Sequence, residues 1–213
     1  MRNTFVLACS VAALLLQLAL HDARAATTAE VDFGAPMLLV ATKALDASPY
    51  RETVLLAFPS GAGGHVGFVL NRSTEATVAS LFPGDKAAQL VTAPVSVGGP
   101  SLQNAMFALV RGAAADRSGL LEITPQVFVA LSAGAVNRVL TDKTVDARFF
   151  LGLVVWQADQ LANELRAGAW DVMPPEADLV LSKNADGLWE QLASRTRGAL
   201  VLFVPASRRA GIG

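Results

Sequence analysis

Short apolar runs alternate with glycine- and proline-containing turns from residue 34 onward. Runs rich in β-branched and large apolar residues predict strands at 36–41, 53–58, 65–71, 94–98, 105–111, 119–123, 149–155, 169–173, 178–182 and 199–204. Patterns of helical period predict helices at 77–82, 125–133, 157–167 and 186–195. The helix at 125–133 is expected to start at Thr124-Pro125, a hydroxyl cap followed by proline, and to end before Gly134.

Strands outnumber helices in this pattern, and several neighbouring strands are joined by short turns. Regular alternation of strand, helix and strand is absent, so a doubly wound parallel sheet is not expected. The pattern predicts one compact α+β domain with a mixed, mostly antiparallel sheet that curls around a core and is flanked by helices. The glycine-rich stretch PSGAGG lies between two strands, so it predicts a hairpin loop and not a phosphate-binding loop.

The first 25 residues have the features of an export signal. Arg2 precedes the uncharged apolar stretch 5–20, and Ala23-Arg24-Ala25 places small residues at the positions that a signal peptidase reads. The apolar stretch is shorter than the roughly 20 residues of a membrane-spanning helix. We therefore expect cleavage after Ala25, a periplasmic or secreted protein, and no stable membrane span afterwards. The linker is expected at 26–33, the domain at 34–205 and a flexible tail at 206–213.

Charge and composition exclude several classes of chemistry. The net charge is −1, and no basic tract precedes the short Arg208-Arg209 pair, so nucleic acid is not expected as a partner. Cys9 is the only cysteine and lies in the signal, which leaves the mature chain without a disulfide or a cysteine-based zinc site. After cleavage His65 is the only histidine, so a histidine-rich metal site is excluded. We expect no metal and no cofactor.

Four motifs in order along the chain resemble the YqgE/AlgH family of bacterial proteins. They are LLVATKALDASPYRETVLL at 38–56, GFVLNRS at 67–73, PVSVGGP at 94–100, and FFLGLVVWQADQLANELRAGAWDV at 149–172. The resemblance implies a compact α+β domain with a barrel-like sheet and flanking helices. It implies little about activity, since the usual family label, transcriptional regulator, names no ligand or reaction.

Asn71-Arg72 and Gly98-Gly99 are candidate ligand-binding residues. An amide and a guanidinium at a strand end can clamp a carboxylate or phosphate. Alternatively, Asn71 satisfies backbone groups of a turn and Arg72 pairs with an acidic neighbour, and this is the interpretation that we favour. The glycines can present N–H groups to an anion, or they form a tight turn with positive φ, which we favour.

A second candidate group is spaced along one predicted helix. Trp156, Gln160 and Glu164 follow one another at intervals of four residues and can line one face of a pocket, with Glu164 as a general base if its pKa is raised. We favour a solvated polar stripe with Trp156 closing the core. His65 with Ser60 suggests hydrolase chemistry, but no nucleophile-elbow pattern accompanies them, and an exposed loop histidine is the favoured interpretation.

Three functions remain open, in this order. The first is an exported binding or regulatory domain without a catalytic residue. Its ligand is a small anion or an envelope protein partner. The second is a hydrolase-like enzyme that uses His65 or Glu164. The third is a direct regulator of transcription, which the export signal and the acidic balance disfavour.

Overall fold

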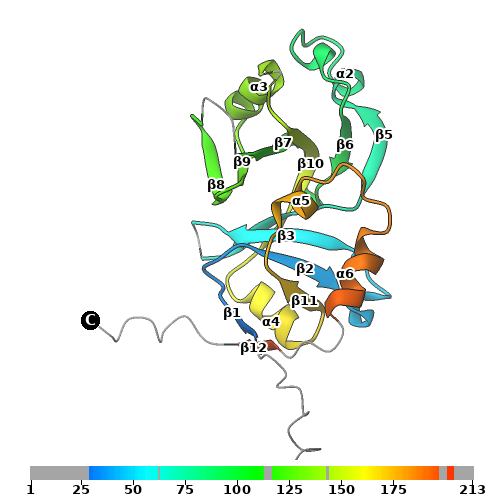
Figure 1. The fold of residues 1–213 in the computed structure, drawn as a ribbon, viewed down its shortest axis with the longest axis vertical. Coiled ribbons are helices and arrows are strands. Elements are labelled where there is room, and N and C mark those ends of the chain that lie inside the picture. The colour runs from blue at the N-terminus through cyan, green and yellow to red at the C-terminus, as the bar shows by residue number, and fades with distance from the viewer. Residues whose placement is uncertain (1–28, 62, 113–116, 143, 197–200, 204–213) are drawn as a thin grey trace, which may run out of the picture.

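The structure is a computed structural model that describes residues 29–61, 63–112, 117–142, 144–196 and 201–203 (Figure 1). The expected signal peptide at 1–25 and the expected tail at 206–213 lie outside these residues. The strands are β1 Ala29–Val31, β2 Met37–Ala41, β3 Val54–Pro59, β4 His65–Val69, β5 Ser73–Thr77, β6 Pro94–Val97, β7 Ser101–Arg111, β8 Leu120–Thr124, β9 Val127–Ala130, β10 Ala147–Trp156, β11 Trp170–Met173 and β12 Val201–Phe203. The helices are α2 Val78–Leu81, α3 Ala133–Thr141, α4 Gln160–Arg166, α5 Ala177–Val180 and α6 Leu188–Thr196, with short 3-10 turns η1 Lys43–Leu45 and η2 Ala88–Leu90.

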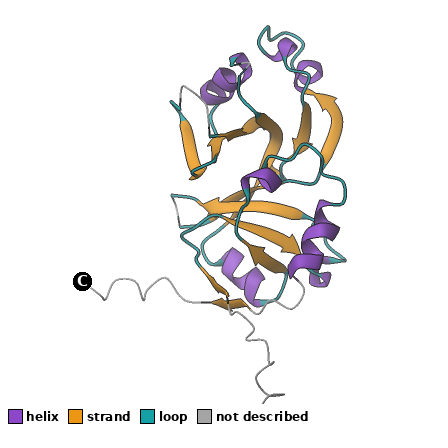
Figure 2. Cartoon of the chain, in the orientation of Figure 1, coloured by secondary structure: helices purple, strands orange, loops and turns teal. Residues whose placement is uncertain are grey.

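One ten-stranded sheet forms the body of the domain, and the helices lie around it (Figure 2). Its main path runs β11-β2-β3-β4-β10-β7-β9-β8, and β6 joins β10 and carries β5. All pairs in this sheet are antiparallel except β6 with β10. The curled, mostly antiparallel sheet confirms the α+β prediction.

β10 belongs to both halves of the sheet. Residues 147–151 pair with β7, and 149–151 pair with β6 on the other side. Leu153 pairs once more with β7, at Ser101, and residues 154–156 pair with β4. The register shifts between Leu151 and Leu153, where Gly152 has a φ of +70°. A β-carbon on Gly152 would lie 2.4 Å from the carbonyl oxygen of Gly99, so only glycine fits this bend.

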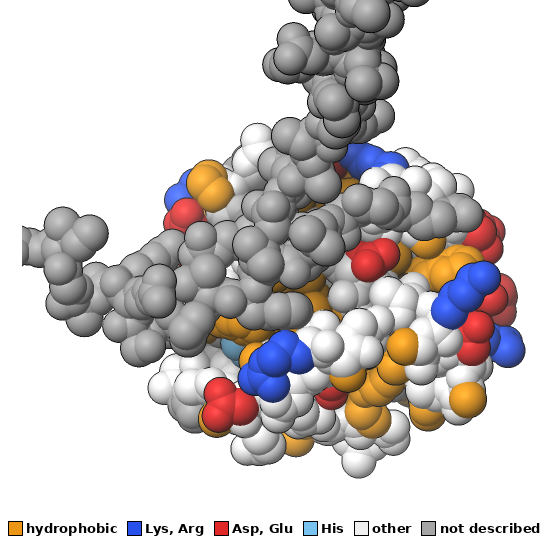
Figure 3. Space-filling view, turned by 90° about the horizontal axis from the view of Figure 1, so that it is seen from below, with side chains coloured by type: hydrophobic (Ala, Val, Ile, Leu, Met, Phe, Trp, Pro, Cys, Tyr) orange, Lys and Arg blue, Asp and Glu red, His pale blue; other side chains and the backbone are white. Residues whose placement is uncertain are grey.

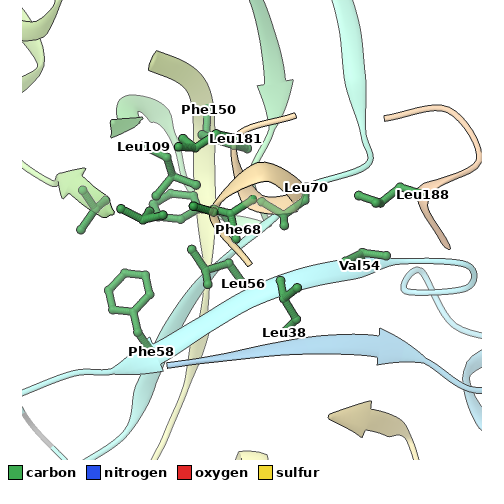
Figure 4. Close-up of a cluster of buried hydrophobic side chains, with 14 of the residues drawn as sticks. Leu38, Val54, Leu56, Phe58, Phe68, Leu70, Leu109, Phe150, Leu181 and Leu188 are labelled. Atoms are coloured by element: carbon green, nitrogen blue, oxygen red, sulfur yellow. The ribbon is translucent and has the colours of Figure 1, made fainter. Parts of the chain in front are cut away.

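Three clusters of buried apolar side chains stabilise the two halves and the space between them. The central cluster combines Leu56, Phe68, Leu109 and Phe150 from the sheet with Leu181, which directly follows α5 (Figure 4). Phe68 and Phe150 have ring centroids 5.1 Å apart, within the range of favourable aromatic contacts. A second cluster lies under α4, and a third lies under α3.

A buried arginine ties α5 to the sheet. Arg148 on β10 is 5% exposed and donates hydrogen bonds to the carbonyl oxygens of Val180, at 3.0 Å, and Leu70, at 2.7 Å. Burial lowers the pKa of Arg148 to about 10, and the guanidinium stacks 5.1 Å from the ring centre of Phe150. It therefore bonds two carbonyl oxygens that come from different elements, one from α5 and one from the segment that follows β4.

Three predictions about local structure were wrong. The segment predicted as a helix at 125–133 forms β9, because Pro125-Gln126 is the turn between two antiparallel strands and Ser132 caps α3 instead. The strand predicted at 178–182 is the single turn α5. Part of the expected linker forms β1, which pairs in parallel with β12, and Val31 is buried in the second core cluster.

Candidate functional site

Asn71 connects the end of β4 to the segment that leads into β3. Its Oδ1 accepts a hydrogen bond from the backbone N–H of Val54 at 2.9 Å, and its Nδ2 donates to the carbonyl oxygen of Glu52 at 2.8 Å. Glu52 itself has a φ of +53°, an uncommon conformation for a residue with a side chain. Asn71 therefore does what we favoured from sequence: it satisfies backbone groups of a turn.

Arg72 bonds the same turn from the other side. Its Nη2 donates to the carbonyl oxygen of Pro49 at 2.7 Å and to Oγ1 of Thr53 at 3.2 Å. We expected Arg72 to pair with an acidic neighbour. Among the described residues, Arg72 forms no ion pair. The guanidinium instead binds oxygen atoms of the turn, which fixes its position.

A pocket of about 610 Å³ opens beside this turn, within the size range of small-molecule sites. It is formed by the turn at 46–52, by Asn71 and Arg72, and by the segment at 185–190 that begins α6. Trp189 lies in its wall, held by a hydrogen bond from the indole N–H to the carbonyl oxygen of Ala41 at 2.8 Å. The sequence indicated Asn71 and Arg72 as candidate binding residues. It did not indicate that residues 185–190, more than 110 positions away, would line the same pocket.

The pocket carries charges of both signs and is acidic in sum. Two arginines, Arg51 and Arg72, face four carboxylate side chains, which belong to Asp46, Glu52, Asp186 and Glu190. Within the described part of the chain none of the four carboxylates has a hydrogen-bond or ion-pair partner for its side chain. The pocket therefore presents unpaired negative charge to solvent.

Gly98 and Gly99 do not form an anion-binding turn with Asn71-Arg72. The N–H of Gly98 donates to the carbonyl oxygen of Leu151, and its own carbonyl accepts from Val69. Neither glycine is among the residues with positive φ, so the expected left-handed turn was wrong. Glycine is required for a different reason: β-carbons at these positions would lie 2.2 Å from backbone atoms of β10.

Trp156, Gln160 and Glu164 come together, as their spacing predicts. The Glu164 carboxylate accepts from the indole N–H of Trp156 at 2.9 Å and from the amide of Gln160 at 3.1 Å. It also accepts from the indole of Trp170 at 2.9 Å, a partner on β11 that helical spacing cannot reveal. The three side chains therefore join α4 to two strands. Trp156 is buried, as expected, whereas Gln160 is exposed and Glu164 is partly buried.

Tyr50 brings the Glu164 cluster close to the turn that lines the pocket. Its ring packs edge-on against Trp170, with centroids 5.8 Å apart. Burial raises the pKa of Tyr50, and the negative charge of Glu164 raises it further. Tyr50 is thus a neutral phenol at neutral pH and contributes packing to this region.

His65 is buried, so the expectation of an exposed loop histidine was wrong. Its Nε2 lies 3.0 Å from the carbonyl oxygen of Phe33, and the two rings meet edge to face at 6.1 Å. Burial lowers the pKa of His65. None of His65, Ser60 and Glu164 lines the pocket beside Asn71.

The described residues add three observations. Basic and acidic side chains are interspersed with apolar ones on the face shown in Figure 3, with no continuous basic area visible there. Among the described residues, no three His, Cys, Asp or Glu side chains are grouped so that they could hold a metal ion. No helix in this part of the chain has the length and apolar character needed to cross a membrane.

The fold and the site define the class of protein. It is a single α+β domain with a curled antiparallel half-barrel and a polar pocket at a strand end. The chain belongs to the AlgH-like family, whose model matches residues 38–201. It is 28% identical over 179 residues to a UPF0301 protein of Chlorobium phaeobacteroides, covering 82% of this chain and 93% of that protein. A UPF0301 protein of Chlorobaculum tepidum is 27% identical, with 80% and 90% covered.

Two solved structures share the fold. A protein from Corynebacterium diphtheriae superimposes with a TM-score of 0.63 at 19% identity, covering 79% of this chain and 90% of that one. The AlgH protein from Pseudomonas aeruginosa gives a TM-score of 0.60 at 20% identity, with 83% and 94% covered. These likenesses establish the architecture and leave the ligand to be inferred from the site.

Proposed function

We propose that this chain is a non-catalytic, exported binding domain, and that its pocket beside Asn71-Arg72 takes the basic side chains of a protein partner. The observation that carries the proposal is the set of four unpaired carboxylates around a pocket of about 610 Å³. Unpaired carboxylates of like charge attract a cationic group at close range. The small anion suggested by the sequence fits less well, because the two arginines are outnumbered and Arg72 already bonds the turn.

The walls of the pocket support binding without rearrangement. Asn71 and Arg72 together make five hydrogen bonds to residues 49–54, which fix the turn. The aromatic face of a fixed Trp189 is also suited to a cation, since cations are attracted to the face of an indole ring. A preformed site loses less conformational freedom on binding, which favours affinity.

Titration calorimetry with three probes tests the site. The probes are trilysine, triglutamate and inorganic phosphate, each added to the mature chain at low salt. We expect trilysine to bind and to weaken as salt rises, because exposed charges are screened beyond about 10 Å at 0.1 M salt. Binding of phosphate or triglutamate in place of trilysine would favour the anion hypothesis, and no binding by any probe would refute the site.

A double variant, Asp186→Asn with Glu190→Gln, locates the binding. Exposed ion pairs contribute about 0.2–1 kcal/mol each, so removal of two carboxylates should weaken trilysine binding roughly 2- to 30-fold. The matched control is the double variant Glu75→Gln with Glu122→Gln, which removes two exposed carboxylates, on β5 and β8, that do not line the pocket. Equal weakening in both proteins would show that trilysine responds to overall charge alone.

Export is part of the proposal and has a separate test. It is supported by the pattern of residues 1–25, with a positive start, an apolar stretch and Ala23-Arg24-Ala25. The measurement is the intact mass of the protein recovered from each cell fraction of its host. A periplasmic species that begins at Ala26 is expected, and a full-length cytoplasmic species would contradict export.

A further inference from the structure

A second pocket, of about 340 Å³, lies between η2, α3 and β10 on the half of the molecule that contains the third core cluster. Its walls are mainly apolar and include Leu90, Val139, Leu140 and Phe149. Three of these residues belong to the buried core, and Leu90 is 67% exposed. The pocket is therefore an opening from the surface into the core, with a size at the lower end of the range for small ligands.

A network of charges borders this pocket and is balanced internally. Lys183, which lines the pocket, has its Nζ 3.0 Å from Asp146, and Asp146 also binds Arg111 at 3.2 Å. Arg111 reaches Asp178 at 3.1 Å, so the network holds two cations and two anions. Lys183 thus has its carboxylate partner already, and the network as a whole offers no excess positive charge to an anionic ligand.

Asp142, at the end of α3, is the other charged residue in the lining. Its Oδ1 accepts from the backbone N–H of Thr144 at 3.0 Å and from its hydroxyl at 2.7 Å, and these bonds lower the pKa of Asp142. The side chain is therefore ionised at neutral pH. Within the described residues Asp142 has no ion-pair partner, so an apolar pocket carries one uncompensated negative charge.

From this arrangement we infer that the pocket binds a small protonated amine with a hydrocarbon body. The hydrocarbon part would replace water against Leu90, Val139 and Phe149, and burial of apolar surface is favourable. The ammonium group would pair with the Asp142 carboxylate. An alcohol of the same length would retain the first interaction and lose the second, and a carboxylate of the same length would be repelled by Asp142.

Three six-carbon probes test this inference on the mature chain: hexylamine, hexanol and hexanoate. Binding is followed by NMR shifts of the Leu90, Val139 and Leu140 methyl groups, since an amine can also enter the acidic pocket beside Asn71. From these methyl signals we expect hexylamine to bind about 1.4- to 5-fold more tightly than hexanol, which is the contribution of an exposed ion pair. Hexanoate should bind weakest.

The variant Asp142→Asn should remove the preference of the pocket for hexylamine over hexanol. Its amide oxygen can still accept from Thr144, so the local turn is retained. The control is Asp85→Asn, another exposed aspartate whose Oδ1 accepts from backbone N–H groups, at Ala87 and Ala88. Equal affinity for the three probes, an unchanged preference in Asp142→Asn, or shifts confined to the pocket beside Asn71 would each overturn the inference.

Discussion

Replacing Asn71 by alanine should destabilise the domain by an amount that its two hydrogen bonds set. The bond from the N–H of Val54 matters most, because Val54 is fully buried and its N–H would be left without an acceptor. An orphaned buried donor costs about 1–3 kcal/mol. The bond to the carbonyl of Glu52 lies in an exposed environment, where water can replace the amide, so it adds about 0.5 kcal/mol.

The free energy of unfolding of Asn71→Ala should therefore fall by roughly 1.5–3.5 kcal/mol. Urea unfolding at equilibrium measures this difference directly. For a chain of this size, each kcal/mol corresponds to a decrease of about 2–4 °C in Tm, so calorimetry should show a decrease of roughly 3–14 °C.

Two further variants separate the contributions. Asn71→Asp keeps an acceptor for Val54 and loses the donor to Glu52, so its loss should be clearly smaller than that of Asn71→Ala. Asn104→Ala, an exposed asparagine on β7, should stay within about 0.5 kcal/mol of the wild type. If Asn71→Ala behaves like Asn104→Ala, Asn71 does not satisfy the buried N–H of Val54.

Three other variants probe separate parts of the fold. Gly98→Ala should lose about 3 kcal/mol of unfolding free energy or fail to fold, since its β-carbon would lie 2.2 Å from the carbonyl oxygen of Gly152. The control Gly84→Ala has open space around its β-carbon and should unfold at nearly the wild-type urea concentration. Glu164→Gln should lose about 1–2 kcal/mol in urea unfolding followed by tryptophan fluorescence, and a loss no larger than that of the exposed Glu190→Gln would contradict its role. His65 has a folded pKa below its ordinary value of 6.5, so the unfolded chain takes up the proton first and stability should fall as pH drops below about 6.5. His65→Gln should reduce the difference in urea midpoint between pH 7.5 and pH 5.5, and an undiminished difference would place the titrating group elsewhere.

The sequence predicted those elements whose local signals agree with their tertiary environment. The apolar runs at 36–41, 53–58 and 65–71 form β2, β3 and β4 within a few residues of their predicted bounds. The helix predicted at 125–133 failed because a cap and a proline describe a β-turn as well as a helix start. The apolar run VFVA that follows decides between them, and it pairs with β7. The run at 178–182 failed because a short buried stretch has no visible period.

The candidate site was predictable only in its local part. Spacing along one helix brought Trp156, Gln160 and Glu164 together, but Trp170 joins them from a separate strand. Asn71 and Arg72 were identified as candidate binding residues, yet two of the four carboxylates in their pocket come from residues 185–190. Contacts between residues far apart in sequence depend on how the sheet curls, and one sequence carries no local pattern that reports this.

The bend of β10 at Gly152 also limits where the chain can be cut into two fragments. Because the same strand pairs with β6 and β7 up to Leu151, with β7 again at Leu153 and with β4 from Val154, a cut near residue 152 would leave each fragment with half of a shared strand. Neither half is a module that a gene fusion or a truncation could transplant intact. For protein engineers, the usable breakpoints therefore lie outside residues 147–156. A split reporter built on this fold would have to keep all of β10 in one of its two fragments.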